Sequence, residues 1–277
     1  MTNGMTRADL LGAPRFLSSK DFYVLTQVYI LFSNPVQLCG FAQLDCSPSS
    51  YHILKHLHHF LHLKMATSSE PTPSFPSSSD PSAPEPAAIQ SLITHLDLQP
   101  LIEGGYFVET DRDPLLIPSP FPPTPATPSH PSRPGFDPAL RNASTNIFYL
   151  LTPRSPLGHL HRNRPRIIHT LHRGRGRYVV IHAEATPPRV ETFVVGPNVE
   201  AGERLQWIIE GGTYKASFLL PDREGGSESK SGLLITETVV PGFELFDHDF
   251  LTKARLERLV GTEEARKLAW LVKPEEE

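Results

Sequence analysis

The sequence predicts an all-β protein, a double-sheet jelly roll with a few short peripheral helices, and three observations lead to this fold class. After Ser144, short segments rich in Val, Ile, Thr and aromatic residues follow one another, a composition that favours strands. Gly and Pro residues separate these segments, as expected at turns. Seven or eight short strands at this spacing are typical of a sandwich or barrel, most naturally a jelly roll.

The individual elements follow from the same patterns. The expected strands lie at residues 146–152, 167–172, 177–183, 189–196, 204–210, 215–220 and 233–240. Upstream, Ile89, Leu92, Ile93 and Leu96 recur at helical spacing, which predicts a short amphipathic helix ending before Pro100. From about Thr252 the pattern becomes helical again, and we expect this tail to pack on the barrel or on a partner subunit. Its two apolar faces comprise Leu256, Leu259 and Val260, and Leu268, Leu271 and Val272.

Proline clusters delimit the folded part of the chain. Residues 67–86 consist mainly of Ser, Pro, Thr and acids, and such a segment buries too little apolar surface to offset its ordering entropy. A second cluster, residues 114–138, holds ten prolines in 25 residues and reads as a long insertion over a loop. We therefore expect one domain over residues 87–277, behind a leader, residues 1–86.

The leader contains a histidine-rich stretch, YHILKHLHHFLHLKM. Within it, His52/His56 and His58/His62 have the spacing that places both side chains on one helix face, which allows a helical metal site. The alternative is a biased segment without structure, because no carboxylate is nearby to complete a metal shell. A third possibility is that translation starts at Met65 and the upstream residues are spurious.

Composition excludes several classes of protein. The formal net charge is −4 and the pI about 6.4, so the chain has no general attraction to nucleic acid or membranes. The longest charge-free apolar run, Phe22 to Phe32, is shorter than the roughly 18–20 residues a spanning helix needs and lacks a signal-peptide cleavage site. Only Cys39 and Cys46 are present, so no disulfide framework is expected. These features predict a cytoplasmic protein.

The stretch PLGHLHRNRPRIIHTLHRGRGRY, residues 156–178, contains four histidines, six arginines and no acid. Its Gly-His-x-His, Gly158 to His161, followed by a strand, a Gly turn and another strand, resembles the first motif of the cupin superfamily. Together with IEGGYFVETDR, NIFYLLTP, GERLQWIIEGGTYKASFL and ETVVPGFELFDHDF, it makes residues 101–250 similar to the RmlC-like Cupin_5 family of uncharacterised function in fungi and bacteria. The resemblance implies a cupin barrel that binds a small molecule and forms a homodimer.

In metal-binding cupins the first motif supplies two histidines and a glutamate, and the second motif another histidine. His159 and His161 match the pair, but arginines stand where the acid is expected and Lys215 stands near the place of the last histidine. Positive side chains repel a cation, and a strong divalent site gathers at least three neutral or anionic ligands. We therefore expect no cofactor and no tight metal site, with a divalent metal at His159/His161 as the minor alternative.

The histidines instead favour a pocket for an anionic small molecule. His159 and His161 share one side of an extended strand, and either His169 or His172 must point inward from the next strand. Imidazole is the usual proton-transfer group near neutral pH, so His161 is the expected base. Arg166 is the expected clamp for a carboxylate or phosphate. The alternative for these residues is a place at the rim or at a dimer interface.

Two acidic segments are the candidates for orienting this base. In EGGYFVETDR, Gly104 and Gly105 permit a turn or a close backbone approach. The resemblance places this segment at the barrel mouth, where the pocket candidates would be Glu103, Tyr106, Glu109 and Arg112. In PGFELFDHDF, Asp247 is the candidate carboxylate for a His–carboxylate dyad. The alternatives are a structural ion pair for Glu109 and a solvated acidic turn for Asp247.

Trp207 and Tyr214 offer flat faces for a sugar or base ring, with core packing as the alternative. No array of aromatic residues accompanies the arginine runs, which argues against nucleic acid. The sequence thus predicts a small-molecule-binding protein, as a metal-independent isomerase- or epimerase-like enzyme acting on an anionic sugar-like or carbonyl compound. A non-catalytic ligand-binding or scaffold protein is the second hypothesis, and a metal-dependent oxygenase the third.

Overall fold

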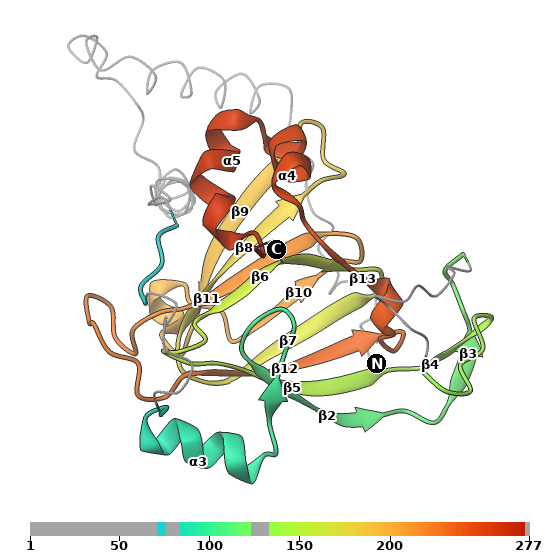
Figure 1. Cartoon of the computed structure of the whole chain (residues 1–277), viewed down its shortest axis with the longest axis horizontal. Coiled ribbons are helices and arrows are strands. Elements are labelled where there is room, and N and C mark those ends of the chain that lie inside the picture. The colour runs from blue at the N-terminus through green and yellow to red at the C-terminus, as the bar shows by residue number, and fades with distance from the viewer. Residues whose placement is uncertain (1–70, 76–83, 123–132, 275–277) are drawn as a thin grey trace, which may run out of the picture. The chain divides into compact units, whose positions relative to one another are not determined.

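Alternating apolar residues after Ser144 fold into two antiparallel β-sheets that pack face to face (Figure 1). The structure is a computed structural model that describes residues 71–75, 84–122 and 133–274, all within the unit Ser68–Glu277. Sheet 1 has the order β1-β2-β5-β12-β7-β10. Its strands are β1 (Gln99–Pro100), β2 (Tyr106–Arg112), β5 (Thr145–Leu151), β12 (Leu233–Val240), β7 (Arg166–Arg173) and β10 (Gln206–Ile209).

Sheet 2 has the order β13-β6-β11-β8-β9. Its strands are β13 (His248–Phe250), β6 (Leu157–Asn163), β11 (Tyr214–Leu219), β8 (Gly176–His182) and β9 (Arg189–Val195). All seven strands expected after Ser144 are confirmed, and the jelly roll is confirmed with them. Each sheet keeps two edge strands, so the sheets form an open sandwich rather than a closed barrel.

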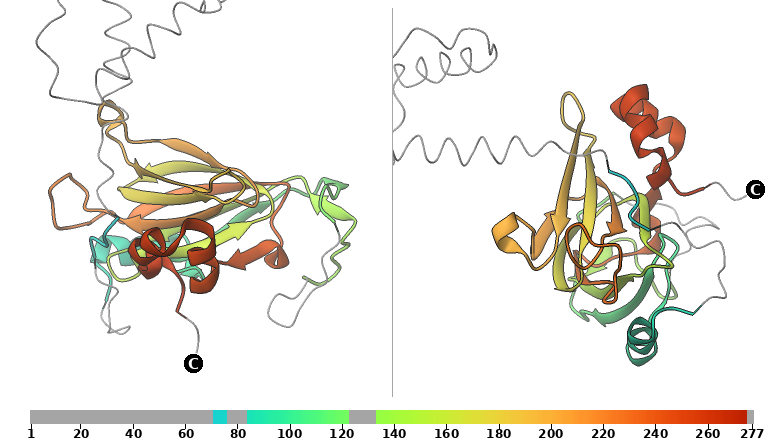
Figure 2. Two further views of the ribbon diagram at one scale, coloured as in Figure 1. Left: turned by 90° about the horizontal axis from the view of Figure 1, so that it is seen from above. Right: turned by 90° about the vertical axis from the view of Figure 1, so that its left-hand side faces the viewer.

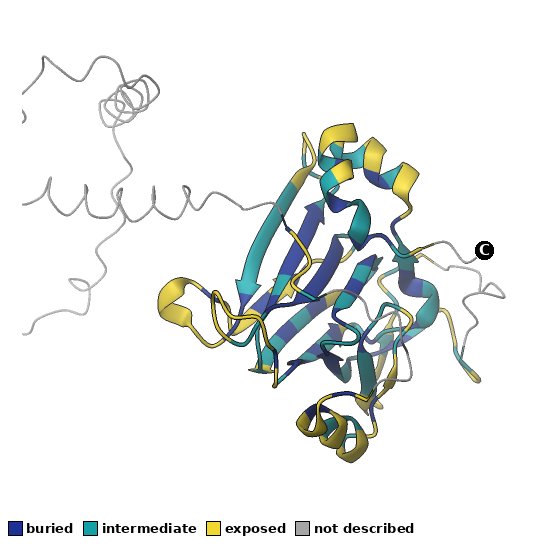
Figure 3. Ribbon diagram, turned by 60° about the vertical axis from the view of Figure 1, so that its left-hand side comes forward, coloured by how far each residue is buried: buried dark blue, intermediate teal, exposed yellow. Residues whose placement is uncertain are grey.

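The interior between the sheets comes from side chains that alternate along each strand. Apolar residues of this layer include Leu151, Val180, Leu219, Leu233 and Ile235. Figure 3 shows the buried residues along the central strands. The same alternation sends a smaller set of polar side chains into this layer, and these are the basis of the candidate site.

Short helices cover the two outer faces of the sandwich (Figure 2). Helix α3 (Ala87–His95) buries Ile89 against the outer face of sheet 1, which confirms the helix expected before Pro100. Helices α4 (Lys253–Val260) and α5 (Thr262–Leu268) and the 3₁₀ turn η3 (Ala269–Leu271) cover sheet 2. Leu256, Leu268 and Leu271 are buried there, so the tail packs on its own domain.

Part of the proline-rich insertion is ordered as a two-stranded ribbon. Strand β3 (Leu116–Pro118) pairs with β4 (Leu140–Asn142), while residues 123–132 lie outside the described residues. The histidine-rich leader stretch also lies outside them. Two further 3₁₀ turns are η1 (Val199–Ala201) and η2 (Leu245–Asp247). Among the described helices, none has the length and apolar character needed to cross a membrane.

Candidate functional site

A buried cross-sheet ion pair lies in the interior of the sandwich. Lys215 projects inward from β11, and its Nζ lies 2.7 Å from Glu237 Oε2 on β12 of the opposite sheet. Nζ also donates a hydrogen bond to His169 Nε2 at 3.0 Å, and His169 stands beside Glu237 on the ladder of β7 and β12. The Lys215 side chain is only 3% exposed, so this group is screened from bulk water.

The neighbouring strand β10 completes this part of the interior with an aromatic ring. Trp207 pairs with His169 in register and stacks on it with ring centroids 5.2 Å apart. Its indole Nε1 is buried and has no hydrogen-bond partner among the described residues. A buried donor without a partner costs about 1–3 kcal/mol, so an acceptor bound beside Trp207 would be stabilised by this N–H.

A second group consists of Glu103, His161 and His248. His161 pairs with Lys215 on the antiparallel ladder of β6 and β11, so both side chains leave the same face of sheet 2. The two oxygens of Glu103 face the two imidazoles: Oε2 lies 3.1 Å from His161 Nε2, and Oε1 lies 3.1 Å from His248 Nε2. The carboxylate that meets the predicted base is therefore Glu103, rather than Asp247 or Glu109.

Two glycines explain how Glu103 reaches this position. Gly104 has φ +102°, and a Cβ there would lie 2.0 Å from the carbonyl oxygen of Leu157. Gly105 has φ +71°, and its Cβ would lie 2.7 Å from the carbonyl oxygen of Leu150. Only glycine tolerates this backbone in such close contact. The turn lies against β5 and β6, which confirms the close approach expected from the sequence.

A β-bulge in β6 separates the two histidines of the Gly-His-x-His motif. Lys215 pairs with His161 and Ser217 with Gly158, so β6 carries one more residue than β11 between these points. His159 therefore does not share the direction of His161. It hydrogen-bonds the backbone of Leu271 beneath the C-terminal helices, and the strict alternation assumed from the sequence fails at this point.

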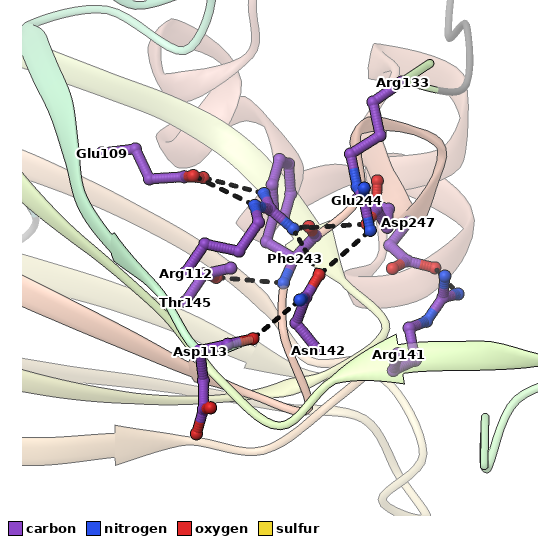
Figure 4. A network of polar contacts seen from close by, with 10 residues as sticks. All are labelled: Glu109, Arg112, Asp113, Arg133, Arg141, Asn142, Thr145, Phe243, Glu244 and Asp247. Carbon is purple, nitrogen blue, oxygen red and sulfur yellow. Dashed lines mark hydrogen bonds and ion pairs between the residues drawn. The ribbon is translucent and has the colours of Figure 1, made fainter. Parts of the chain in front are cut away.

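An arginine network fixes the segment that carries His248 (Figure 4). Glu244 Oε1 lies 3.3 Å from Arg112 Nη1 and 2.8 Å from Arg133 Nε. Asp247 Oδ1 lies 3.2 Å from Arg141 Nη2, and the Arg141 side chain is 2% exposed. The network thus holds both sides of η2, and His248 follows directly.

This network also contains three residues that the sequence assigned to the pocket: Glu109, Arg112 and Asp247. Glu109 is 40% exposed and pairs with Arg112 at 2.8 Å. Asp247 lies between Arg141 and Arg164, the latter at 3.7 Å, instead of beside an inward histidine. Burial raises the pKa of Asp247 to about 6, although Arg141 and Arg164 act against this. Their placement suits a structural role in holding the η2 segment.

Burial and neighbouring charges set the protonation of the interior groups. Burial lowers the pKa of His161 to about 4, although Glu103 opposes the shift, and burial also lowers the pKa of His169. Burial acts to raise the pKa of Glu103, but the adjacent His161 and His248 outweigh it and lower the value to about 2. Lys215 likewise outweighs burial and holds the pKa of Glu237 far below its ordinary value. Near pH 7 both carboxylates are ionised, and His161 and His169 are neutral.

Other predicted pocket residues lie outside the interior. Arg166 is 46% exposed and pairs with Glu210 at 3.0 Å. His172 is exposed and contacts Thr236 and the edge of Phe148. Tyr106 packs near α3 with Leu150. Tyr214 is buried on the outer face of sheet 2, with the Arg162 guanidinium 4.9 Å from its ring centroid.

Lys215, Glu237 and His248 are the interior residues to which the sequence gave no role in a pocket. The strand pattern contains a signal for two of them. Glu237 is the single acid in LLITETVV and alternates with the buried Leu233 and Ile235. Lys215 alternates in the same way with the buried Ser217 and Leu219. A charged residue in phase with the buried side of a strand thus indicates an interior site.

The fold and the site together define a class: jelly-roll proteins that place ionisable side chains between their two sheets. The family model described as "Cupin superfamily (DUF985)" matches residues 90–251. The chain belongs to this family, which confirms the resemblance found in the sequence.

Three similar proteins bring no assigned function to this chain. The chain is 43% identical over 186 residues to the uncharacterized protein YML079W of Saccharomyces cerevisiae, covering 67% of this chain and 86% of the relative. A solved structure of a hypothetical protein from Leishmania major is similar, with 27% identity, a TM-score of 0.54 and coverage of 67% and 98%. Protein SO0799 of Shewanella oneidensis matches with 21% identity and a TM-score of 0.49, covering 67% of this chain and 97% of its own.

Proposed function

We propose that the chain binds a small anionic compound, of sugar-like or carbonyl type, between its two sheets, with Lys215 as the anion contact. The observation that carries this proposal is the state of the Lys215 ammonium. An ammonium has three N–H donors, and within the described residues two of them are used, toward Glu237 and His169. The third donor is available to a ligand oxygen.

The surroundings of Lys215 support the same ligand chemistry. The indole N–H of Trp207 is a second buried donor without a partner among the described residues, and it belongs to the ring stacked on His169. Two donors that share one buried region favour an anionic oxygen, because hydrogen bonds to charged acceptors are the stronger ones. Burying the Lys215 ammonium and the Glu237 and Glu103 carboxylates costs free energy. A role in ligand binding explains why these charged groups lie in the interior.

An isomerase- or epimerase-like proton transfer on the same compound is the second candidate, favoured by the neutral imidazoles of His161 and His169 in this interior. As a base, His161 would need a free ring nitrogen. Its Nδ1 faces the carbonyl oxygen of His159 at 2.8 Å, and its Nε2 faces Glu103. Both nitrogens are directed at protein atoms, so the geometry favours ligand binding through Lys215 over proton abstraction by His161.

Native mass spectrometry of the full chain, followed by titration with sugar phosphates and keto acids, tests the proposal. Replacing Lys215 by Met together with Glu237 by Gln removes both charges of the pair, and we expect ligand binding to be lost with the fold retained. Lys253→Met, an exposed lysine on α4, is the matched control and should bind normally. Unchanged affinity in the double variant would contradict the proposal. Deuterium exchange into a bound ligand, lost in His161→Ala, would establish the proton-transfer candidate.

A further inference from the structure

We infer that Glu103, His161 and His248 hold a divalent metal ion at a site that needs no anionic ligand. Each side chain offers one ligand atom, and the three atoms lie within 4.8 Å of one another. Glu103 Oε2 lies 3.1 Å from His161 Nε2, and Glu103 Oε1 lies 3.1 Å from His248 Nε2. Metal–ligand bonds of roughly 2.0–2.2 Å place neighbouring donors about 2.8–3.6 Å apart, from octahedral to tetrahedral geometry, so these two separations suit a shared ion.

The hydrogen bonding of His161 supports a cation at this point. A neutral imidazole has a single N–H, and His161 faces an acceptor on each side: the His159 carbonyl at Nδ1 and the Glu103 carboxylate at Nε2. When Nδ1 donates to the carbonyl, the Nε2 lone pair points at the carboxylate. Nε2 is buried and makes no hydrogen bond within the described residues. A positive ion between Nε2 and Glu103 removes this conflict.

The bond from Nδ1 to a backbone carbonyl is itself the arrangement that metal-ligating histidines use to fix ring and tautomer. The other two donors are equally well fixed. Glu103 is held by the turn through Gly104 and Gly105, where its backbone oxygen accepts a hydrogen bond from His159 N at 2.7 Å. His248 follows Asp247, which is paired with the buried Arg141. Ligands on fixed backbone need little rearrangement to bind an ion.

The positive residues that argued against a metal in the sequence are neutralised in the structure. Lys215 is paired with Glu237 at 2.7 Å, so the pair carries no net charge toward the site. Arg162, Arg164 and Arg166 pair with Asp249, Asp247 and Glu210, respectively. The acid missing from the motif is supplied by Glu103, about 60 residues earlier in the chain, and the further histidine by His248 in β13.

Two imidazoles and one carboxylate suit a first-row divalent ion such as Zn²⁺, Fe²⁺ or Mn²⁺, and three protein ligands leave coordination positions open. His161 and Lys215 project from the same face of sheet 2, because they are partners on the ladder of β6 and β11. An anionic ligand bound to Lys215 therefore has a route to the ion. The metal site stands without this ligand and is tested with the metal alone.

The test is a Co²⁺ titration of the full-length chain, purified without an affinity tag and stripped with a chelator. The leader histidines are the same in every variant, so the comparison is between variants. Glu103→Gln and His248→Gln keep side-chain size, and each should lose one equivalent of Co²⁺ with its d–d absorption band, with affinity at this site lowered more than ~100-fold. His172→Ala, which removes an exposed histidine on the outer face of sheet 1, is the control and should match the wild type.

Equal Co²⁺ stoichiometry and spectra in Glu103→Gln, His248→Gln and His172→Ala would overturn the inference. If the variants do not fold, the wild type alone decides. Anomalous diffraction from wild-type crystals grown with Zn²⁺ should show a peak within bonding distance of all three donors. Bound zinc confined to other histidines would overturn the inference and leave the anion contact at Lys215 untouched.

Discussion

Removing Lys215 alone should destabilise the protein far more than removing the complete ion pair. In Lys215→Met the Glu237 carboxylate stays buried, with its side chain only 9% exposed, beside a neutral His169. Leaving one partner of a buried pair uncompensated costs about 3–5 kcal/mol. For a domain of this size that corresponds to a fall in Tm of about 6–20 °C.

The double variant Lys215→Met/Glu237→Gln removes both charges and keeps the volumes similar. Replacing a buried ion pair in this way is often neutral or stabilising, so we expect its free energy of unfolding to lie within about 1 kcal/mol of the wild type. Guanidinium titration, followed by the fluorescence of the two tryptophans, measures both variants. Trp207 stacks on His169 and reports the interior directly.

The order of stabilities decides the outcome. The single variant should be the least stable of the three proteins, and the double variant should recover most of the lost stability. A single variant as stable as the double one would show that Glu237 is reached by water or neutralised without cost. The buried ion pair, and the anion contact that depends on it, would then be refuted.

Three further predictions follow from the same contacts. The folded-state pKa of Glu237 is depressed, so its contribution to the free energy of unfolding is present above the unfolded pKa of about 4.3 and is lost as the pH falls toward the folded value. Acid titration should therefore destabilise the wild type more than the double variant. Parallel curves of stability against pH for the two proteins would contradict this. Gly104→Ala forces a Cβ against the Leu157 carbonyl at positive φ and should lower the free energy of unfolding by about 3 kcal/mol or more. The control Gly202→Ala, with positive φ but nothing within 4 Å, should lower it by about 1 kcal/mol. Equal losses of stability in thermal denaturation would refute the close contact. Arg141→Met leaves the buried Asp247 with Arg164 as its remaining arginine partner and should lower the free energy of unfolding by about 3 kcal/mol. Arg164 is partly exposed and lies 3.7 Å from Asp247, so Arg164→Met should cost less than about 1 kcal/mol. The reverse order of stabilities in urea unfolding would show that Arg164 is the main partner of Asp247.

Much of the fold was predictable because the strands are locally specified. The segments around Val179, Phe193 and Ile235 combine β-branched and aromatic residues with Gly or Pro at their ends, and each became a strand. The helix at Ile89 followed from its 3.6-residue period. The short edge strands β1 and β13, of two and three residues, carry too few residues for a periodic signal.

The site was harder to predict because three of its determinants are non-local. The bulge at His159 depends on how β6 pairs with β11, and no residue spacing reveals it. Whether Asp247 or Glu103 contacts His161 depends on which loop crosses that end of the sandwich. Asp247 instead forms an ion pair with Arg141. The arginines of the motif looked like an anion clamp only because their acidic partners are distant in the chain.

Homodimer formation, which the family resemblance implies, stays a prediction.

Glu103, His161 and His248 come from the beginning, the middle and the end of the described domain, and this spread has a consequence during synthesis. A nascent chain displays the turn and the motif long before β13 has left the ribosome, so the three side chains can meet only after the last sheet strand docks. Any ion or metabolite held there would stabilise the finished fold and have no affinity for its precursors. Loss of the final thirty or so residues would remove His248 from this group of ligands, and it would also uncover the face of sheet 2 that Leu256, Leu268 and Leu271 bury.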